Sequence, residues 1–139
     1  MAPRQHHRSA SPYEDQIGFS RAVRVGDRVI VSGTAPIGPD GRTVPGGPLE
    51  QARRCCSVIV EALRALGAGP EHVVRTRMYL TRAEDWALVG QAHAEAFSAA
   101  RPAATMVVVA GLLDPGWRVE MEAEAVIPGD QRTSMAQSS

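Results

Sequence analysis

Charged and apolar side chains alternate near the end of the chain. Arg118, Glu120, Glu122 and Glu124 are separated by single apolar residues, and a period of two places all four on one face of a β-strand. Such a row is more often a ladder of ion pairs than a reactive site. A glutamate beside a cleft is different, because burial raises its pKa and suits it to general acid or base catalysis. Glu120 is therefore the candidate catalytic residue.

Two other segments carry groups that could assist. Arg75, Arg77 and Tyr79 alternate along a predicted strand, so arginines and glutamates on one sheet face can pair across strands. His93 lies on the apolar stripe of a predicted helix. A histidine in that position is more often a core or interface residue than a catalyst, although its titration near neutral pH leaves a catalytic role open.

Composition excludes several mechanisms. The 139 residues include 15 Lys or Arg side chains, all of them arginine, and 15 acidic ones, for a formal net charge of zero. Without a lysine the chain cannot form a lysine Schiff base or supply a P-loop lysine. The neutral balance gives no support to nucleic-acid binding. Neither a Ser-His-Asp or Cys-His arrangement nor a dinucleotide-binding glycine motif is recognisable.

The sequence predicts no metal or cofactor site. His6 and His7 stand in a segment rich in proline and serine, where further ligands are lacking. Cys55 and Cys56, the two cysteines, are too few for a four-ligand zinc site or a disulfide framework. We interpret them as small core residues in a reducing compartment. Because no apolar segment matches a secretory signal or a membrane span, we expect a cytoplasmic protein without membrane partners.

The length predicts one domain over residues 19–127, with a flexible leader at 1–18 and a flexible tail at 128–139. Within the domain, strand and helix periodicities alternate. The predicted strands cover residues 20–25, 28–32, 73–81, 103–110 and 117–127, and the predicted helices cover 48–66 and 83–99. The order β-β-α-β-α-β-β predicts an α/β (α+β) fold.

Both helices should cover the same face of the sheet, because crossovers between parallel strands are right-handed. The other face would stay bare, with Ala104, Met106 and Val108 among its apolar residues. Burial of this face against further copies predicts a closed homo-oligomer. Any ligand cleft would then lie at the seams between subunits.

Three segments of the chain have the character of family signatures. Residues 19–36 read FSRAVRVGDRVIVSGTAP, residues 73–97 read VVRTRMYLTRAEDWALVGQAHAEAF, and residues 101–127 read RPAATMVVVAGLLDPGWRVEMEAEAVI. The first resembles PYSQAV followed by a strand ending in SGQ, and the third resembles PARSxVEVxxLP with VEIEAxAV. These are motifs of the Rid family, the reactive-intermediate imine deaminases also called YjgF-like or L-PSP proteins. The second segment resembles the strand and helix in the middle of that family.

The resemblance implies a chorismate-mutase-like fold, assembled as a homotrimer with three clefts between neighbouring subunits. It also implies hydrolysis of an imine or enamine, such as 2-aminoacrylate, to a keto acid and ammonia. In typical members the arginine of the PAR motif holds the substrate carboxylate, while a last-strand glutamate and backbone groups near the SG turn position water. Ser32, Gly33 and Glu120 match the turn and the glutamate.

The chain departs from this pattern at four positions. Ala104 stands in place of the PAR arginine, Met106 in place of a frequent cysteine, Phe19 in place of a tyrosine, and Gly90 in place of an asparagine. A charge-assisted arginine fork contributes roughly 1.5–3 kcal/mol, so its loss should weaken amino-acid-derived imines by about one to two decades. We therefore expect an activity other than standard 2-aminoacrylate deamination.

Two functional hypotheses follow. The first is an enzyme that adds water to, or transfers a proton on, a larger or less acidic imine, enamine or related unsaturated metabolite, with Arg77, Arg101 or His93 supplying the missing charge. Its predicted site comprises catalytic Glu120 and substrate-binding Phe19, Ser32, Gly33, Arg77, Trp86, Gly90, His93, Ala104 and Met106. The second is a homotrimer that binds a small molecule without catalysis. Endoribonuclease activity, ascribed to some family members, is disfavoured by the neutral charge and the absent lysines.

Overall fold

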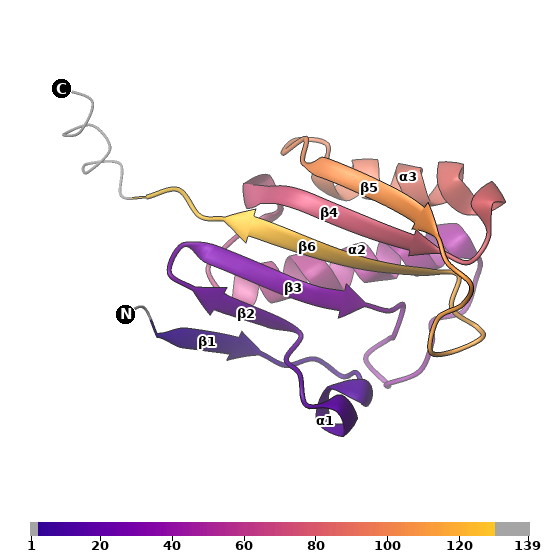
Figure 1. Cartoon of the computed structure of the whole chain (residues 1–139), viewed down its shortest axis with the longest axis horizontal. Coiled ribbons are helices and arrows are strands. Elements are labelled where there is room, and N and C mark those ends of the chain that lie inside the picture. The colour runs from indigo at the N-terminus through magenta and orange to yellow at the C-terminus, as the bar shows by residue number, and fades with distance from the viewer. Residues whose placement is uncertain (1–2, 130–139) are drawn as a thin grey trace.

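Six strands form one mixed sheet in the computed structural model, which describes residues 3–129 (Figure 1). Their order is β1-β2-β3-β6-β4-β5. The strands are β1 (Arg4–His7), β2 (Ala22–Val25), β3 (Arg28–Thr34), β4 (Val73–Leu80), β5 (Ala103–Val108) and β6 (Val119–Val126). The helices are α1 (Tyr13–Ile17), α2 (Pro48–Ala65) and α3 (Trp86–Phe97), with 3-10 turns at Pro70–His72 and Ala83–Asp85. The predicted fold class is confirmed, as is the order of the domain's strands and two long helices.

Strand β6 joins the two halves of the sheet. It pairs antiparallel with β3 on one side and with β4 on the other, whereas β4 and β5 are parallel neighbours connected through α3. Strands β2 and β3 form a hairpin, and Gly26 in its turn has a φ of 62°, a conformation that favours glycine. Strand β6 therefore lies at the centre of the sheet, where side chains of β3 and β4 flank any site on it.

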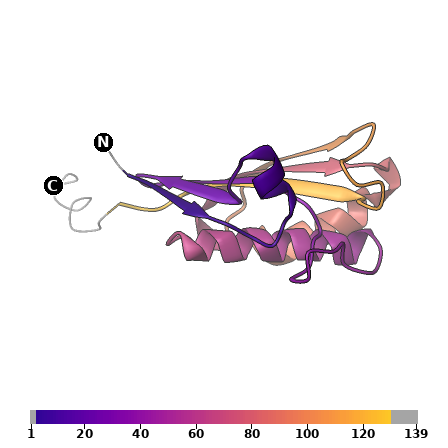
Figure 2. The same ribbon diagram turned by 90° about the horizontal axis from the view of Figure 1, so that it is seen from below.

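Helices α2 and α3 cover one face of the sheet (Figure 2). Helix α2 begins at Pro48, whose fixed φ suits a first turn, and ends before Gly67, whose φ is 86°. Its stripe of buried residues includes Ala52, Cys55, Ile59, Ala62 and Leu63. The sheet contributes to the same core Val119, Met121, Ala123 and Ala125 of β6. The strict alternation predicted for the last strand is confirmed.

The opposite face of the sheet carries the predicted charges. Arg77 pairs in register with Glu122, and Tyr79 with Glu120. The Arg77 guanidinium lies 3.2 Å from a Glu122 carboxylate oxygen, which also accepts the Tyr79 hydroxyl at 2.7 Å. Arg28 reaches Glu124 at 3.4 Å. The expectation that arginines and glutamates pair across strands is confirmed.

Residues 4–7 and 13–17 belong to the fold, which corrects the prediction of a flexible leader over residues 1–18. Strand β1 pairs with β2, from Arg4 opposite Val25 to His7 opposite Ala22. Helix α1 follows and ends at Gly18, whose φ of 89° suits a left-handed cap. Backbone pairing, which side-chain patterns report poorly, orders this segment. Residues 1–2 and residues 130–139, which hold most of the predicted tail, lie outside the described residues.

Strand β5 faces the other way from the prediction. Ala104, Met106 and Val108 were expected on the bare face, yet they pair in parallel register with Thr76, Met78 and Leu80, which are buried on the helix side. Met106 packs against the helix-covered core. The register with β4 therefore turns Thr105 and Val107, beside Arg77 and Tyr79, toward the open face.

Within residues 3–129, none of the helices combines the length and apolar character needed to cross a membrane. The same residues contain no group of three or more His, Cys, Asp or Glu side chains that could hold a metal ion. Cys55 and Cys56 are buried as free thiols, and burial raises the pKa of Cys56 to about 12.

Candidate functional site

A cavity of about 280 Å³ opens beside Glu120 on the open side of the sheet. It lies where the end of β3 and the start of β6 meet α1 and the loop that precedes β6. Four predicted site residues line it together: Phe19, Ser32, Gly33 and Glu120. The other lining residues are Ser11, Tyr13, Ile17, Arg21, Ala35, Leu113 and Trp117.

The Glu120 carboxylate lies directly over Gly33. The β3–β6 register shifts between Val31 and Thr34, and this irregularity brings the backbone close to the neighbouring side chain. A β-carbon built at Gly33 would be 2.7 Å from Glu120 Oε1, which is shorter than van der Waals contact. A side chain at position 33 would therefore compete with the Glu120 carboxylate for the same space.

Burial tunes the acidity of Glu120. The side chain is half-buried, and loss of solvent raises its pKa above the ordinary value for glutamate. The positive charge of Arg21 opposes this rise, and the negative charge of Glu122 adds to it. A raised pKa makes the carboxylate a stronger base than an ordinary glutamate, which suits it to general acid or base catalysis.

Aromatic and aliphatic side chains form the walls of the cavity. Tyr13 and Trp117 pack edge to face, with ring centroids 5.6 Å apart at 76°. The Trp117 indole donates to Thr43 Oγ1 at 2.9 Å. Ile17 and Leu113 stand at the rim and are among the most exposed large apolar residues of the chain. The cavity therefore offers one carboxylate in largely apolar surroundings.

Gln51 and Asp85 hold the loop that leads into Glu120. The Gln51 amide donates to the Gly116 carbonyl at 3.0 Å and accepts from the Arg118 backbone N–H at 2.8 Å. The Arg118 side chain forms a bidentate pair with Asp85, at 2.7 and 3.0 Å. Arg118, predicted as part of the charge ladder, therefore anchors the start of β6.

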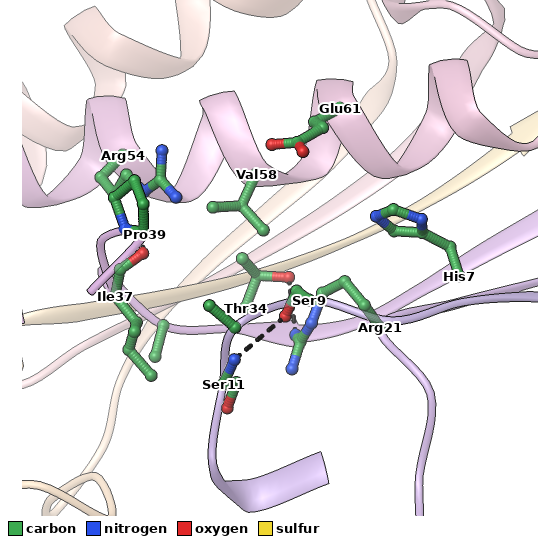
Figure 3. A pocket seen from close by; sticks show the side chains of 12 residues that line it. His7, Ser9, Ser11, Arg21, Thr34, Ile37, Pro39, Arg54, Val58 and Glu61 are labelled. Carbon is green, nitrogen blue, oxygen red and sulfur yellow. Dashed lines mark hydrogen bonds between the residues drawn. The ribbon is translucent and has the colours of Figure 1, made fainter. Parts of the chain in front are cut away.

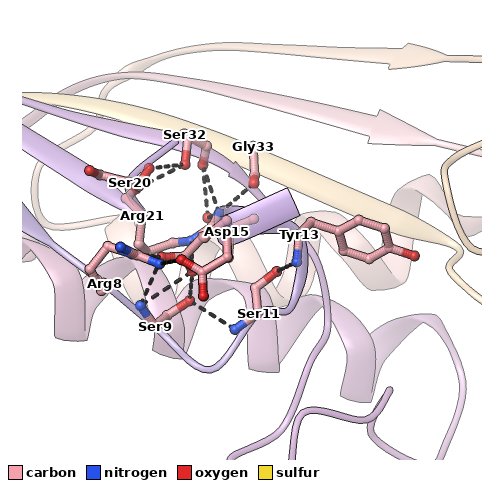
Figure 4. A network of polar contacts seen from close by, with 11 residues as sticks. Arg8, Ser9, Ser11, Tyr13, Asp15, Ser20, Arg21, Ser32 and Gly33 are labelled. Carbon is pink, nitrogen blue, oxygen red and sulfur yellow. Dashed lines mark hydrogen bonds and ion pairs between the residues drawn. The ribbon is translucent and has the colours of Figure 1, made fainter. Parts of the chain in front are cut away.

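Arg21 is the site residue that sequence reasoning missed. Its side chain is almost fully buried, yet it lines the cavity. Its Nη1 donates to the Gly33 carbonyl, to Thr34 Oγ1 at 3.0 Å and to the Ser32 carbonyl at 3.5 Å, as Figure 4 shows for Ser32 and Gly33. Arg21 stands where the family motif PYSQAV has glutamine. This difference from the motif is the sequence feature that could have identified Arg21.

A second cavity of about 240 Å³ lies on the helix side of Arg21 (Figure 3). Helix α2 lines it with Arg54, Val58 and Glu61, and the chain before α1 lines it with Ser9 and other residues. None of the predicted site residues lines this cavity. Arg21 therefore separates two cavities, and only one of them contains Glu120.

The remaining predicted site residues lie elsewhere in the single chain. Helix α3 carries Trp86, Gly90 and His93 on the helix-covered side. His93 Nε2 is 2.7 Å from Thr76 Oγ1, its ring packs 5.2 Å from that of Phe97, and burial lowers its pKa. Trp86 is 64% exposed. His93 is half-buried, and its contacts agree with the interpretation of a satisfied core or interface residue.

Arg77, Arg101, Ala104 and Met106 also lie away from the Glu120 cavity within one chain. Arg77 is engaged by Glu122, and Arg101 has a positive φ of 49° at the turn before β5. Ala104 and Met106 lie on β5, at the opposite edge of the sheet from β1. Any contact between these residues and the cavity would have to come from another subunit.

Substitution of Gly33 by alanine should displace the Glu120 carboxylate. The added methyl group would contact Oε1 at 2.7 Å, so the flexible glutamate must move. A displacement of this kind should slow a reaction that uses Glu120 as acid or base on the order of 10²-fold, measured as the initial rate of turnover. Gly111→Ala is the control, because a β-carbon there meets nothing within 4 Å. Equal rates for Gly33→Ala and the wild type would show that the contact is irrelevant.

Comparison with known proteins agrees with this geometry. The family model described as Endoribonuclease L-PSP matches residues 11–127. The mouse protein named 2-iminobutanoate/2-iminopropanoate deaminase is 35% identical over 109 residues, which are 78% of this chain and 80% of that protein. A crystal structure from Mycobacterium tuberculosis, described as a member of the YjgF family, is 41% identical with a TM-score of 0.80, covering 90% of this chain and 100% of that one.

A second solved structure, the YjgF gene product of E. coli, is 26% identical with a TM-score of 0.75 and covers 88% of this chain and 94% of that one. The family match spans the cavity from Ser11 to Glu120 and includes every strand from β2 to β6. The chain therefore belongs to the L-PSP family, the family of the YjgF and Rid proteins.

Proposed function

We propose that this protein hydrolyses small imines or enamines, with Glu120 as the acid and base. The observation that carries the proposal is the half-buried Glu120 carboxylate, which rests on Gly33 inside an apolar cavity. The 35% identity with a mammalian iminoacid deaminase supports the reaction class. In this reaction water and an imine become a carbonyl compound and ammonia, so no redox partner is required.

The carboxylate form of Glu120 would begin the reaction. It takes a proton from a water molecule while the water oxygen bonds to the carbon of the protonated imine, whose nitrogen receives the electron pair of the C=N double bond, giving a neutral carbinolamine. The resulting carboxylic acid then donates its proton to the nitrogen, and the carbon–nitrogen bond breaks. Ammonia leaves with that electron pair, and the hydroxyl proton passes to the Glu120 carboxylate or to water as the carbonyl forms. A pKa raised by burial suits both steps.

The walls of the cavity favour apolar substrates. Tyr13, Ile17, Phe19, Leu113 and Trp117 line it, and the arginine of the family's PAR motif is Ala104 here. Imines made from leucine or phenylalanine by an amino acid oxidase should therefore be hydrolysed faster than 2-iminopropanoate. The expected ratio of kcat/KM is roughly tenfold or more, measured as ammonia release above the spontaneous rate. A preference for 2-iminopropanoate would contradict the proposed specificity.

The proposed assembly is a homotrimer that buries the open face of the sheet. Ile30 and Val107 on that face are 45% and 42% exposed in the single chain, and the exposed Ile17 and Leu113 stand at the rim of the cavity. Apolar groups gathered in this way favour association. Sedimentation equilibrium tests the assembly, and a stable, folded monomer would contradict it.

The alternative function is binding without catalysis. It is favoured by the replacement of four polar or charged family site residues by Phe19, Gly90, Ala104 and Met106. Native mass spectrometry against a metabolite library distinguishes the two functions. Retention of a small molecule without turnover of any imine would support the accessory role, whereas turnover that depends on Glu120 would exclude it.

A further inference from the structure

We propose that Arg21 is the positioning residue of the site: locked by Glu14, its guanidinium fixes the backbone beneath Glu120 and holds a positive charge next to the cavity. The catalytic meaning of this arrangement rests on the proposed function, but the arrangement itself can be tested without turnover. Arg21 touches neither the water nor the imine in this proposal, and it acts through Gly33 and Glu120.

One nitrogen atom of the Arg21 side chain contacts the segment under Glu120 at three points. Arg21 Nη1 donates to the Gly33 carbonyl, to the Thr34 hydroxyl and to the Ser32 carbonyl. These three residues form the irregular end of β3, where the register with β6 shifts. Because the ladder with β6 is interrupted there, the side-chain hydrogen bonds from Arg21 replace part of the lost support. The position of the Gly33 backbone beneath Glu120 therefore depends on the position of the guanidinium.

Glu14 keeps the guanidinium in place. Glu14 is 1% exposed, and its Oε2 lies 3.6 Å from Arg21 Nε. The Ser9 backbone N–H donates to it at 3.0 Å, the Ser9 hydroxyl also donates to it, and Arg8 donates to it at 3.1 Å. With so many donors, the carboxylate cannot swing away from Arg21. The ring of Phe19 lies 5.3 Å from the guanidinium carbon and closes the arrangement.

Not every N–H group of the Arg21 guanidinium has a hydrogen-bond acceptor within residues 3–129. Its side-chain hydrogen bonds all start at Nη1, and Nε is buried without a hydrogen-bond acceptor. A guanidinium that served packing alone would be expected to satisfy its buried donors. Nε faces Glu14 at 3.6 Å, while the guanidinium lines the cavity together with Glu120 and its positive charge acts on that carboxylate.

The groups that surround Glu120 set the sign of each expected effect. Arg21 faces it from the segment before β2, Glu122 from β6, Tyr79 from β4, and Tyr13 from α1. Arg21 favours the carboxylate form, so its loss should raise the pKa of Glu120. Glu14 partly cancels the charge of Arg21, so its loss should lower that pKa. A purely structural disturbance predicts no such opposition of signs.

Carboxyl ¹³C NMR titration of Arg21→Gln, Glu14→Gln and the double variant tests the proposal, with the Glu120 signal assigned from Glu120→Gln. The Glu120 pKa should rise in Arg21→Gln, fall by a smaller amount in Glu14→Gln, and rise in the double variant by less than in Arg21→Gln. Arg24→Gln is the matched control, because Arg24 also donates to two backbone carbonyls, those of Gly26 and Leu66.

Shifts of the same sign in both single variants, or no shift, would overturn the proposal. Should Arg21→Gln fold poorly, Glu14→Gln and the double variant still give opposite predictions, since the first lowers the Glu120 pKa and the second raises it. If the wild type hydrolyses no imine but the NMR signs are as expected, the proposed function fails and the positioning role stands. If imines are hydrolysed and the signs are wrong, the reverse holds.

Discussion

Replacement of Glu120 by glutamine is expected to lower kcat for imine hydrolysis by about 10²–10⁴-fold, the usual contribution of a general acid or base. Glutamine has the shape of glutamate and can keep the contact with Gly33, but it cannot take a proton from water. The fold should survive, because Glu120 is half-buried and forms no ion pair within residues 3–129. Ammonia release from the best imine of the panel measures the effect.

Glu124→Gln is the control for this substitution. Glu124 lies on the same face of β6 and pairs with Arg28 at 3.4 Å near the exposed end of the strand. Its substitution also removes one negative charge from β6, yet it should leave the rate almost unchanged. Unchanged turnover in Glu120→Gln would remove Glu120 from the mechanism, and equal losses in both variants would indicate a general charge effect.

The pH dependence provides a second check on Glu120. Burial raises its pKa, and the base form that begins the reaction exists above that pKa. The value of kcat/KM should therefore fall as the pH drops through a point above the ordinary glutamate range. The residual rate of Glu120→Gln should lack this acidic limb.

Side-chain periodicity predicted the central part of the fold for a physical reason. Residues of β6 alternate between the helix-covered core and the open face, and α2 repeats its apolar stripe at helical spacing, so burial leaves a regular trace in the sequence. Strand β1 leaves no such trace, because Arg4, Gln5, His6 and His7 are held by backbone pairing with β2. The face of Ala104 and Met106 depends on the register of β5 with β4, which periodicity alone does not determine.

Part of the candidate site could be predicted from the sequence. Alternation in the last strand identified Glu120, the SG motif identified Ser32 and Gly33, and the three residues meet in the cavity. Arg21 and Glu14 were not predictable in the same way, because charged residues are usually exposed and the pair forms between a short helix and the irregular segment before β2. The turn after α1, where the Gly18 and Phe19 N–H groups donate to the Glu14 carbonyl, brings these two charges together.

The buried pair of Arg21 and Glu14 should dominate the stability of this region. Glu14→Gln removes the ion-pair partner of the buried Arg21 guanidinium, and an uncompensated buried charge typically costs about 3–5 kcal/mol of unfolding free energy. Arg21→Gln should cost less, because Glu14 keeps its ion pair with Arg8 at 3.1 Å and its hydrogen bonds from Ser9. The double variant should lose much less, because no uncompensated charge then remains. Chemical denaturation at one protein concentration measures the changes.

The ion pair of Arg53 and Glu95 provides the matched comparison. It has better hydrogen-bond geometry than the buried pair, at 2.8 and 2.9 Å, but its side chains are 48% and 45% exposed. Water solvates either charge when the other is removed, so Arg53→Gln and Glu95→Gln should change stability far less. If the buried and exposed pairs responded equally, Arg21 would have to be solvated through one of its two cavities. In that case Glu14 would not lock the guanidinium.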